Sequence, residues 1–202
     1  MFNGIVETVG TVTDIQKMDD CIHFLITTPK PLADLFIGES VSVNGVCLTV
    51  TRFTENTFNV TAVPETLRVT NLGALEVGSL VNLECSMKVS GRMGGHYVQG
   101  HVDGVGEILE VKTEGNAALL VKISVPATLA KYTVNKSYIA LDGMSITVIQ
   151  AGPDWITVTF IPHTQQVTII KQYRKGTKIN IEVDILSKYV EKLLGVHACN
   201  PI

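Results

Sequence analysis

The sequence has few of the features that attach a protein to a membrane or to nucleic acid. No apolar run approaches the length needed to span a bilayer, and the N-terminus lacks the charged-then-apolar pattern of a signal segment. The formal net charge is −3 and no cluster of Lys and Arg stands out, which argues against nucleic acids and anionic membranes as partners. These absences predict a cytoplasmic protein.

The sequence also lacks the local motifs of several enzyme classes. The phosphate-binding patterns G-x-x-x-x-G-K-[ST] and G-x-G-x-x-G do not occur. Residues 143–147 lack the second glycine of the nucleophile elbow G-x-S-x-G, so a serine hydrolase is not expected. The cysteines form no C-x-x-C pair and no disulfide framework; they are Cys21, Cys47, Cys85 and Cys199.

The histidine-containing stretch at residues 93–104 is the most unusual local segment. His96, His101 and Asp103 could be metal ligands, but strand alternation would place His96 on the side opposite the other two. No metal site is therefore expected. For His101 two interpretations stay open, a ligand contact or proton donor and a polar residue on a solvated strand face.

What the sequence does contain is a β-hairpin signal that occurs twice. An apolar content of 46% and a charged fraction of 17% are sufficient for packed cores. Residues 40–50 and 138–148 are alternating runs interrupted by Asn-Gly and Asp-Gly, the strongest short-range signal for a two-residue type I′ turn. That turn fixes the register of the first copy, which pairs Val43 with Val46, Ser42 with Cys47, Val41 with Leu48 and Ser40 with Thr49.

Each predicted hairpin has one apolar and one polar face, because directly opposed residues share a face. The apolar faces, expected to enter a core, are Val41, Val43, Val46, Leu48 and Val50 in the first copy and Ile139, Leu141, Met144, Ile146 and Val148 in the second. The polar face of the first hairpin comprises Ser40, Ser42, Cys47 and Thr49. That of the second comprises Tyr138, Ala140, Ser145 and Thr147, and strand alternation places Lys136 on the same side. Such a patch of short polar groups suits a planar polar ligand, and it equally suits solvent.

The repetition extends over two whole domains. Residues 4–10, 60–66 and 78–84 align in order with residues 100–106, 158–164 and 176–182, at an offset of 96 and then 98. Short strands separated by turn residues predict an antiparallel barrel or sandwich in each half. The expected elements of the first half are strands near residues 3–16, 21–28, 39–43, 46–53, 57–63 and 80–86 and a helical turn at 66–72. The linker is expected within residues 87–95, where glycines give the backbone freedom to change direction.

The C-terminus changes to a helical period. From Ile185 onward, apolar residues recur at helical spacing, namely Ile185, Leu186, Tyr189, Val190, Leu193 and Leu194. Gly195 is the expected end of this helix, which has no counterpart after Glu84. Its apolar stripe could dock on its own barrel or on another copy. The predicted domains are residues 1–93 and 94–184, followed by a helix and tail at 185–202.

These motifs together resemble riboflavin synthase of the trimeric, duplicated-barrel type over essentially the whole chain. The longest matches are Met-Phe-Asn-Gly-Ile-Val-Glu at 1–7, Val-Asn-Gly-Val-Cys-Leu-Thr-Val at 43–50, Gly-Gly-His-Tyr-Val-Gln-Gly-His-Val-Asp-Gly at 94–104 and Asp-Gly-Met-Ser-Ile-Thr at 142–147. Shorter matches lie at residues 65–68, 81–84, 131–132 and 180–184. The combination is specific, although any one motif would not be.

The resemblance implies two six-stranded antiparallel Greek-key barrels, a C-terminal helix that holds a homotrimer, and association with lumazine synthase. It implies a transferase, without cofactor or metal, that catalyses the last step of riboflavin biosynthesis. In that step two molecules of 6,7-dimethyl-8-ribityllumazine exchange a four-carbon unit and give riboflavin and 5-amino-6-(ribitylamino)uracil. Each barrel would bind one lumazine, and the N-terminal barrel of one subunit would face the C-terminal barrel of a neighbour.

The resemblance also places substrate contacts in both barrels. In the first barrel they are Gly4, Ile5, Val6, Cys47, Leu48, Thr49, Thr61, Ala62, Val63, Pro64, Glu65 and Thr66. In the second they are Gly100, His101, Val102, Lys136, Ser145, Ile146, Thr147, Thr159, Phe160, Ile161, Pro162, His163 and Thr164. The residues expected to affect turnover are Ser40, Cys47, His101 and Ser145, with Phe2 ordering the N-terminus. The hypothesis is that a hydroxyl or thiol delivers a nucleophile to the acceptor ring, and that His101 assists removal of a proton from the 7-methyl group of the donor.

Two other classes of function compete with this interpretation. A non-catalytic lumazine- or flavin-binding protein would share the fold, but such relatives lose pocket residues of the second copy, and this chain keeps both repeats intact at the ligand-facing positions. A barrel that binds oligonucleotides would need a basic groove and aromatic platforms, which the sequence lacks.

Overall fold

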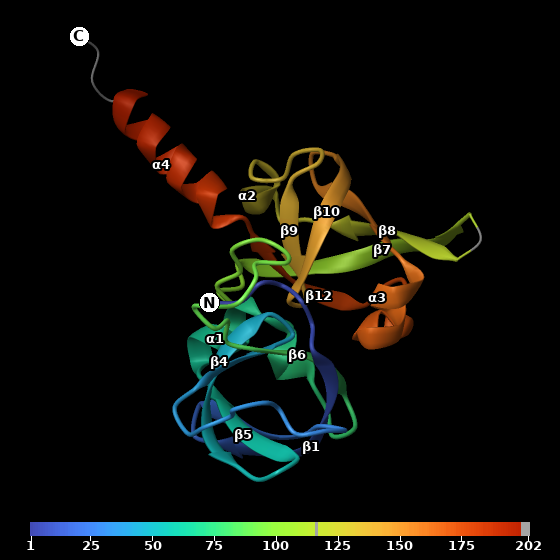
Figure 1. The fold of residues 1–202 in the computed structure, drawn as a ribbon. Helices are drawn as coiled ribbons and strands as arrows, with labels where there is room; N and C mark the ends of the chain where they lie inside the picture. Colours follow the sequence, from blue (N-terminus) through green and yellow to red (C-terminus); the bar gives the residue numbers. More distant parts are fainter. Residues whose placement is uncertain (116, 199–202) are drawn as a thin grey trace.

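Two closed barrels, one from each repeat, make up the structure (Figure 1). The computed structural model describes residues 1–115 and 117–198. The first barrel contains β1 (Thr8–Met18), β2 (Cys21–Thr27), β3 (Ser40–Val43), β4 (Val46–Phe53), β5 (Thr57–Ala62) and β6 (Leu80–Cys85), in the order β1-β2-β5-β4-β3-β6. The second contains β7 (Gly104–Glu114), β8 (Ala118–Ser124), β9 (Tyr138–Leu141), β10 (Met144–Ala151), β11 (Trp155–Phe160) and β12 (Lys178–Val183), in the order β10-β11-β8-β7-β12-β9. In both closed barrels, equivalent strands have the same neighbours, so the two repeats have the same topology. The predicted pair of six-stranded antiparallel barrels is confirmed.

The two hairpins form with the predicted register. All four predicted pairs of the first hairpin are observed, and the second hairpin has the four equivalent pairs. The turn residues have positive φ in both copies, +47° and +79° at Asn44 and Gly45 and +42° and +81° at Asp142 and Gly143. Two successive residues with positive φ are what a type I′ turn requires.

The apolar faces of the hairpins fill the barrel interiors. The five residues of the first apolar face are at most 5% exposed, and in the second only Ile146 is partly buried rather than buried. Burying each such side chain contributes about 1.5–3 kcal/mol. Register shifts interrupt β1, β4, β7 and β10 at equivalent positions of the two repeats. Bulges of this kind bend long strands, which allows each sheet to close on itself.

Short helices connect the last two strands of each barrel. They are α1 (Pro64–Val69) and η1 (Asn71–Ala74) in the first barrel, and α3 (Pro162–Val167) and η2 (Ile169–Gln172) in the second. A proline opens each α-helix, where its missing N–H group would have no intrahelical partner. The helical turn predicted at 66–72 is confirmed in kind but begins at Pro64. The second half also contains α2 (Ala127–Ala130), which the sequence pattern does not predict.

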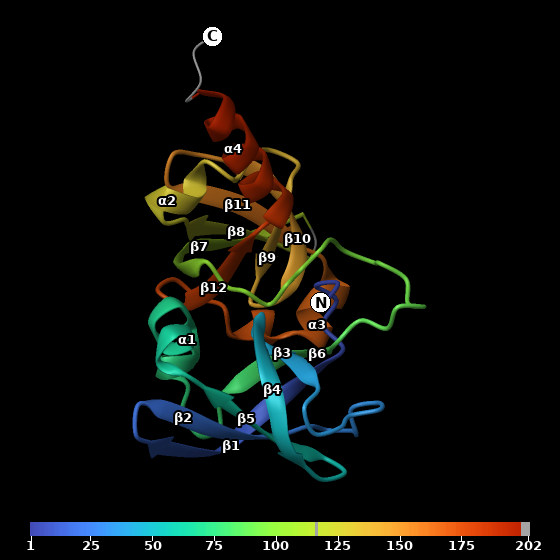
Figure 2. The ribbon, with the colours of Figure 1, turned by 90° about the vertical axis from the view of Figure 1, so that its left-hand side faces the viewer.

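The C-terminal helix α4 (Ile185–Ala198) points away from both barrels (Figures 1 and 2). Its predicted start is confirmed, and Asp184 accepts a hydrogen bond from the Leu186 N–H group there. The predicted end at Gly195 is wrong because the helix continues to Ala198; glycine inside a helix costs only about 1 kcal/mol relative to alanine. The exposed apolar stripe of α4 comprises Leu186, Tyr189, Val190, Leu193 and Leu194, which are 55–66% exposed. Cys199 lies outside the described residues.

The two hairpin turns meet where the barrels contact each other. A Cβ atom added to Gly45 would lie 2.6 Å from the Gly143 nitrogen, and one added to Gly143 would lie 2.8 Å from the Gly45 nitrogen. These glycines are equivalent residues of the two repeats, so an approximate twofold axis passes between them. Phe2 and Val98 are also equivalent, and they exchange backbone hydrogen bonds of 2.8 and 3.3 Å. Both pairs therefore lie on this approximate twofold axis.

Two buried asparagines fasten each turn to the opposite barrel. The Asn82 side-chain amide donates to the Asp142 carbonyl oxygen at 2.9 Å, and the Asn180 amide donates to the Asn44 carbonyl oxygen at 2.8 Å. Their side-chain oxygens accept the N–H groups of Ile169 and Asn71 at 3.0 and 2.7 Å. Both asparagines are 1% exposed. Because a buried unpaired polar group costs about 1–3 kcal/mol, these bonds fix how one barrel sits on the other.

One ionisable group breaks the symmetry of this contact. Asp142 stands where the first repeat has Asn44, and its carboxylate accepts hydrogen bonds from the Asn180 N–H, the Tyr173 hydroxyl and the Asn71 amide. Burial raises the pKa of the Asp142 carboxyl from its ordinary 3.8 to about 7. A raised folded-state pKa means that its contribution to stability is complete below about pH 4 and is lost as the pH rises towards 7.

Asp142→Asn should therefore reduce the dependence of stability on pH. The asparagine oxygen can still accept hydrogen bonds, but the side chain has no proton to lose. We expect the free energy of unfolding, measured with urea, to fall more between about pH 4 and pH 8 in the unmodified protein than in the variant. The exposed Asp20 provides a matched control, and Asp20→Asn should keep the original pH profile. Identical profiles for Asp142→Asn and the unmodified protein would contradict the assignment.

Candidate functional site

The polar faces of the hairpins are divided into a covered part and an exposed part. Ser42 and Ala140, nearest the turns, are each 2% exposed, because the opposite turn covers one and the Phe2 segment covers the other. Thr49 and Thr147, farther from the turns, are exposed. Of the residues on the polar faces, Ser42 and Ala140 are therefore closed to both a ligand and solvent, while Thr49 and Thr147 are accessible.

Cys47 and Ser145 lie directly opposite Ser42 and Ala140 on the paired strands, and each is contacted by the segment that enters a barrel. The Cys47 N–H donates to the Gly100 carbonyl oxygen, and the Ser145 N–H donates to the Gly4 carbonyl oxygen, both at 2.8 Å. A Cβ atom on either glycine would lie 2.6 Å from the Cβ atom of its partner. Both glycines also have positive φ. Only glycine satisfies this combination of contact and conformation.

The segments that precede the first strand of each barrel are thus exchanged between the barrels. Val6 packs against the core of the second barrel, and Val102 packs against the core of the first. The structure thus brings Gly4 beside Ser145 of the second barrel and Gly100 beside Cys47 of the first, whereas the expected grouping assigned residues 4–6 to the first barrel and residues 100–102 to the second. For the same reason the first strand begins at Thr8 rather than near residue 3.

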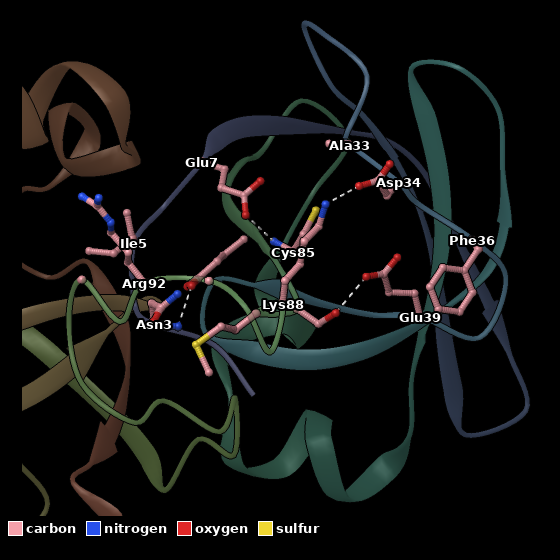
Figure 3. A pocket seen from close by; sticks show the side chains of 15 residues that line it. Asn3, Ile5, Glu7, Ala33, Asp34, Phe36, Glu39, Cys85, Lys88 and Arg92 are labelled. Atoms are coloured by element: carbon pink, nitrogen blue, oxygen red, sulfur yellow. Dashed lines mark hydrogen bonds and ion pairs between the residues drawn. The ribbon is translucent and has the colours of Figure 1, made fainter.

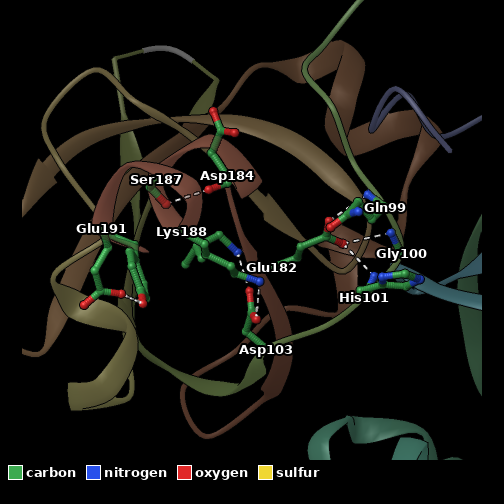
Figure 4. Close-up of polar contacts among 11 residues, drawn as sticks. Gln99, Gly100, His101, Asp103, Glu182, Asp184, Ser187, Lys188 and Glu191 are labelled. Atoms are coloured by element: carbon green, nitrogen blue, oxygen red, sulfur yellow. Dashed lines mark hydrogen bonds and ion pairs between the residues drawn. The ribbon is translucent and has the colours of Figure 1, made fainter. Parts of the chain in front are cut away.

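Two buried glutamates hold the exchanged segments in place, and Figure 4 shows one of them, Glu182, with its backbone partners. Glu84 accepts two backbone N–H groups and Glu182 accepts three, at 2.6–3.0 Å, from Asn3 and Gly4 and from Gln99, Gly100 and His101. Burial raises the pKa of the Glu84 carboxyl to about 7 and raises that of Glu182 as well. The repeated Asn-x-Glu at 82–84 and 180–182 signals the pair in the sequence. Its role could not be predicted, because the partners are backbone groups that almost any residue carries.

The remaining predicted contacts border Cys47 and Ser145 on the neighbouring strands. β4 pairs with β5 through Val50 and Val60, and β10 pairs with β11 through Val148 and Val158. These valines are buried, so the alternating threonines beside them face away from the barrel cores. Thr49 and Thr147 are exposed, whereas Thr61 and Thr159 are partly buried and the Thr159 hydroxyl oxygen is itself buried. From there the chain continues into α1 and α3, which places residues 61–66 and 159–164 at the edges of the two faces.

Some predicted contacts can reach a ligand only through their backbone. Leu48, Ala62 and Phe160 are at most 5% exposed, with side chains in the barrel cores. By contrast His101, Lys136 and His163 are exposed. Ser40 is partly buried at the start of β3, at the end of the hairpin far from the turn.

Sequence reasoning missed one polar contact to Ser145. His96 Nδ1 lies 2.7 Å from Ser145 Oγ, and the imidazole stacks on Tyr138 with ring centroids 5.2 Å apart. No spacing pattern relates these residues, because they lie on different elements. As for the metal interpretation of this stretch, no group of three or more His, Cys, Asp or Glu side chains in the described ranges 1–115 and 117–198 is placed to hold a metal ion.

A cavity of about 580 Å³ lies beside the N-terminal segment, on the side of the first barrel (Figure 3). Of the predicted contacts, Ile5 lines it, together with the carboxylates of Glu7 and Glu39. The Cys85 thiol is in its wall, and burial together with these carboxylates raises the pKa of the thiol to about 12. A thiol that stays protonated is not an activated nucleophile, so thiol chemistry is not expected in this cavity.

Comparisons with known proteins match the duplicated architecture. The family described as lumazine binding domain matches twice, at residues 3–86 and 99–184. Riboflavin synthase of Bacillus subtilis (strain 168) is 42% identical over 194 residues, which cover 96% of this chain and 90% of that protein. Riboflavin synthase of Schizosaccharomyces pombe is 43% identical over 198 residues, covering 98% and 95%. Among solved structures, LumP complexed with riboflavin and LumP complexed with 6,7-dimethyl-8-(1'-D-ribityl) lumazine have TM-scores of 0.84 and 0.82 at 29% identity, each covering 91% of this chain and 99% of that chain.

The two closed barrels with exchanged entering segments define a tandem pair of lumazine-binding domains. None of the helices in the described part of the chain is long and apolar enough to cross a membrane. The close and nearly full-length similarity to curated relatives takes the assignment one step further. The chain belongs to the riboflavin synthase family.

Replacing Gly100 tests the close contact that joins an exchanged segment to a hairpin. Gly100→Ala and Gly78→Ala share the strain of a positive φ, +77° and +95°, which costs about 1–2 kcal/mol. Only the first also forces a Cβ atom against Cys47, since a Cβ atom at Gly78 meets nothing within 4 Å. Gly100→Ala should therefore lower the free energy of unfolding by about 1–3 kcal/mol more than Gly78→Ala does, as measured with urea. Equal losses would show that the contact is looser than described.

Proposed function

We propose that the protein catalyses the riboflavin synthase reaction, in which two molecules of 6,7-dimethyl-8-ribityllumazine give riboflavin and 5-amino-6-(ribitylamino)uracil. The transfer of a four-carbon unit makes it a transferase of riboflavin biosynthesis. The observation that carries this proposal is the near-twofold relation between two sites, in which the contact of Cys47 with Gly100 is repeated by Ser145 with Gly4.

A duplicated site suits a reaction between two copies of one molecule. Two similar pockets can hold two identical heteroaromatic rings through the same kinds of contact. Aligning both reactants replaces a dilute encounter with an effectively unimolecular reaction, an effect on the order of 7–11 kcal/mol. The chemistry of this transfer lies largely in the substrate, so positioning is expected to outweigh any single acid or base.

Each proposed pocket combines one hairpin with the exchanged segment that crosses it. The first pocket comprises Cys47, Thr49, residues 61–66 and residues 100–102. The second comprises Ser145, Thr147, residues 159–164 and residues 4–6, with Lys136 at its rim.

The proposed chemical roles fall to residues of these two faces. His101 is exposed and its backbone is held by Glu182, so its imidazole is available to take a proton from the 7-methyl group of the donor lumazine. Ser40, Cys47 and Ser145 supply the hydroxyl and thiol groups that direct a nucleophile to the acceptor ring.

We propose that a complete site forms between the first barrel of one subunit and the second barrel of a neighbour in a homotrimer. The apolar stripe of α4 supports this, because a helix with such an exposed stripe is stabilised by packing against another subunit. Association with lumazine synthase is proposed from the family resemblance alone. A cytoplasmic location is proposed from the scattered cysteines.

A non-catalytic lumazine-binding role is the second candidate. It draws support from the structural similarity to LumP, at 29% identity. The synthases are more similar, at 42 and 43% identity over nearly the whole chain. The enzyme is therefore the better supported of the two.

Incubation of the purified protein with 6,7-dimethyl-8-ribityllumazine alone distinguishes the candidates. We expect riboflavin and 5-amino-6-(ribitylamino)uracil in equal amounts, each at half the lumazine consumed, when the products are separated by chromatography. Thr147→Trp should fill the second pocket and abolish conversion, whereas Thr113→Trp, on an exposed part of β7, should leave it intact. Stable binding of lumazine without any riboflavin would support the second candidate instead.

A further inference from the structure

His96 is a buried residue that the proposed chemistry leaves without a role. Its side chain lies against Ser145, with Nδ1 at 2.7 Å from Oγ, and it is 6% exposed. The preceding Gly95 shows how closely this segment approaches, since a Cβ atom there would lie 2.8 Å from Ser145 Oγ and 2.1 Å from the Asn3 carbonyl oxygen. The segment is therefore packed directly onto the Ser145 side chain.

The equivalent position in the first pocket has different surroundings. Cys47 stands where the second repeat has Ser145, and it packs against Phe2, Val98 and Ala140. Within residues 1–115 and 117–198 its sulfur has no side-chain hydrogen bond comparable to the His96–Ser145 contact. A thiol in apolar surroundings is also a weaker hydrogen-bond donor than a hydroxyl group. The two proposed pockets thus differ at a pair of equivalent residues, Cys47 and Ser145.

The surroundings of His96 indicate which way its hydrogen bond runs. Burial lowers the pKa of the imidazole, which favours the neutral ring, although Asp184 partly opposes this. Nε2 is buried and has no hydrogen-bond partner in the described part of the chain. A proton on Nε2 would leave a buried N–H group without a partner, which is rarer in proteins than a buried acceptor without one. The proton is therefore placed on Nδ1, which donates to Ser145 Oγ. The Ser145 hydroxyl proton is then free to point away from His96.

We propose that His96 is a positioning residue that fixes the Ser145 side chain, so that its hydroxyl group donates a hydrogen bond to an acceptor atom of the heteroaromatic ring held in the second pocket. This inference rests on the proposed function and adds to it. Because Cys47 has no such partner in the first pocket, the two identical substrates are held unequally. A reaction in which one molecule donates and the other accepts needs such a difference.

Two substitutions at this position separate the hydrogen bond from the ring stacking. His96→Asn keeps a polar donor near the place of Nδ1 but removes the ring that stacks on Tyr138, and His96→Phe keeps the ring but removes the nitrogen. We expect His96→Phe to lower kcat/KM for the lumazine about 3- to 10-fold, the effect of one hydrogen bond, and His96→Asn to stay within about 2-fold of the unmodified protein. The opposite order would show that His96 acts through packing, and would overturn the proposal.

A double variant tests whether His96 acts through Ser145. In a Ser145→Ala background, His96→Phe should cause no further loss of kcat/KM, whereas independent, multiplied losses would overturn the proposal. Fluorescence titration with riboflavin provides a readout that needs no turnover, and His96→Phe should weaken one class of sites while leaving the other unchanged. Absence of turnover in the unmodified protein would reject the proposed function. Identical riboflavin titrations of the unmodified protein and His96→Phe would reject the role of His96.

Discussion

The contact between the two hairpin turns is the constraint on which the rest of the structure depends. Gly45 and Gly143 approach so closely that neither position can carry a side chain. Asn82 and Asn180 reach across to the carbonyl oxygens of the opposite turns, so that the closest approach of the barrels contains satisfied hydrogen bonds. Because these contacts join equivalent residues of the two repeats, they define an approximate twofold axis between the barrels.

The exchange of entering segments is the main consequence of that axis for the site. Each hairpin is contacted by the segment that leads into the other barrel, so each proposed pocket combines residues of both repeats. The repeats are nevertheless unequal at chosen positions, with Cys47 opposite Ser145 and Asn44 opposite Asp142. In the proposed function, near-symmetry would supply two places for the same molecule, and the departures from it would supply the different environments that donor and acceptor require.

The predictable parts of this structure are those whose physics is local. Asn-Gly and Asp-Gly determine turn type and register within a few residues, so both hairpins and their buried faces follow from the sequence. The exchange was not predictable, because Gly4 and Gly100 do not indicate which hairpin they contact. The predicted end of α4 at Gly195 is wrong, because the low helix propensity of one glycine is small beside the summed helix propensity of the other residues in the helix.

Subunit mixing tests the central claim most directly, namely that the two pockets of one reaction lie on different copies of the chain. Thr49→Trp should block only the first pocket and Thr147→Trp only the second, so each variant alone should be inactive. In trimers assembled from an equal mixture, about one quarter of the sites should combine two unblocked pockets, and about one quarter of the unmodified activity should return. If mixed trimers form and remain inactive, the reaction does not take place between subunits and this account of the site is wrong.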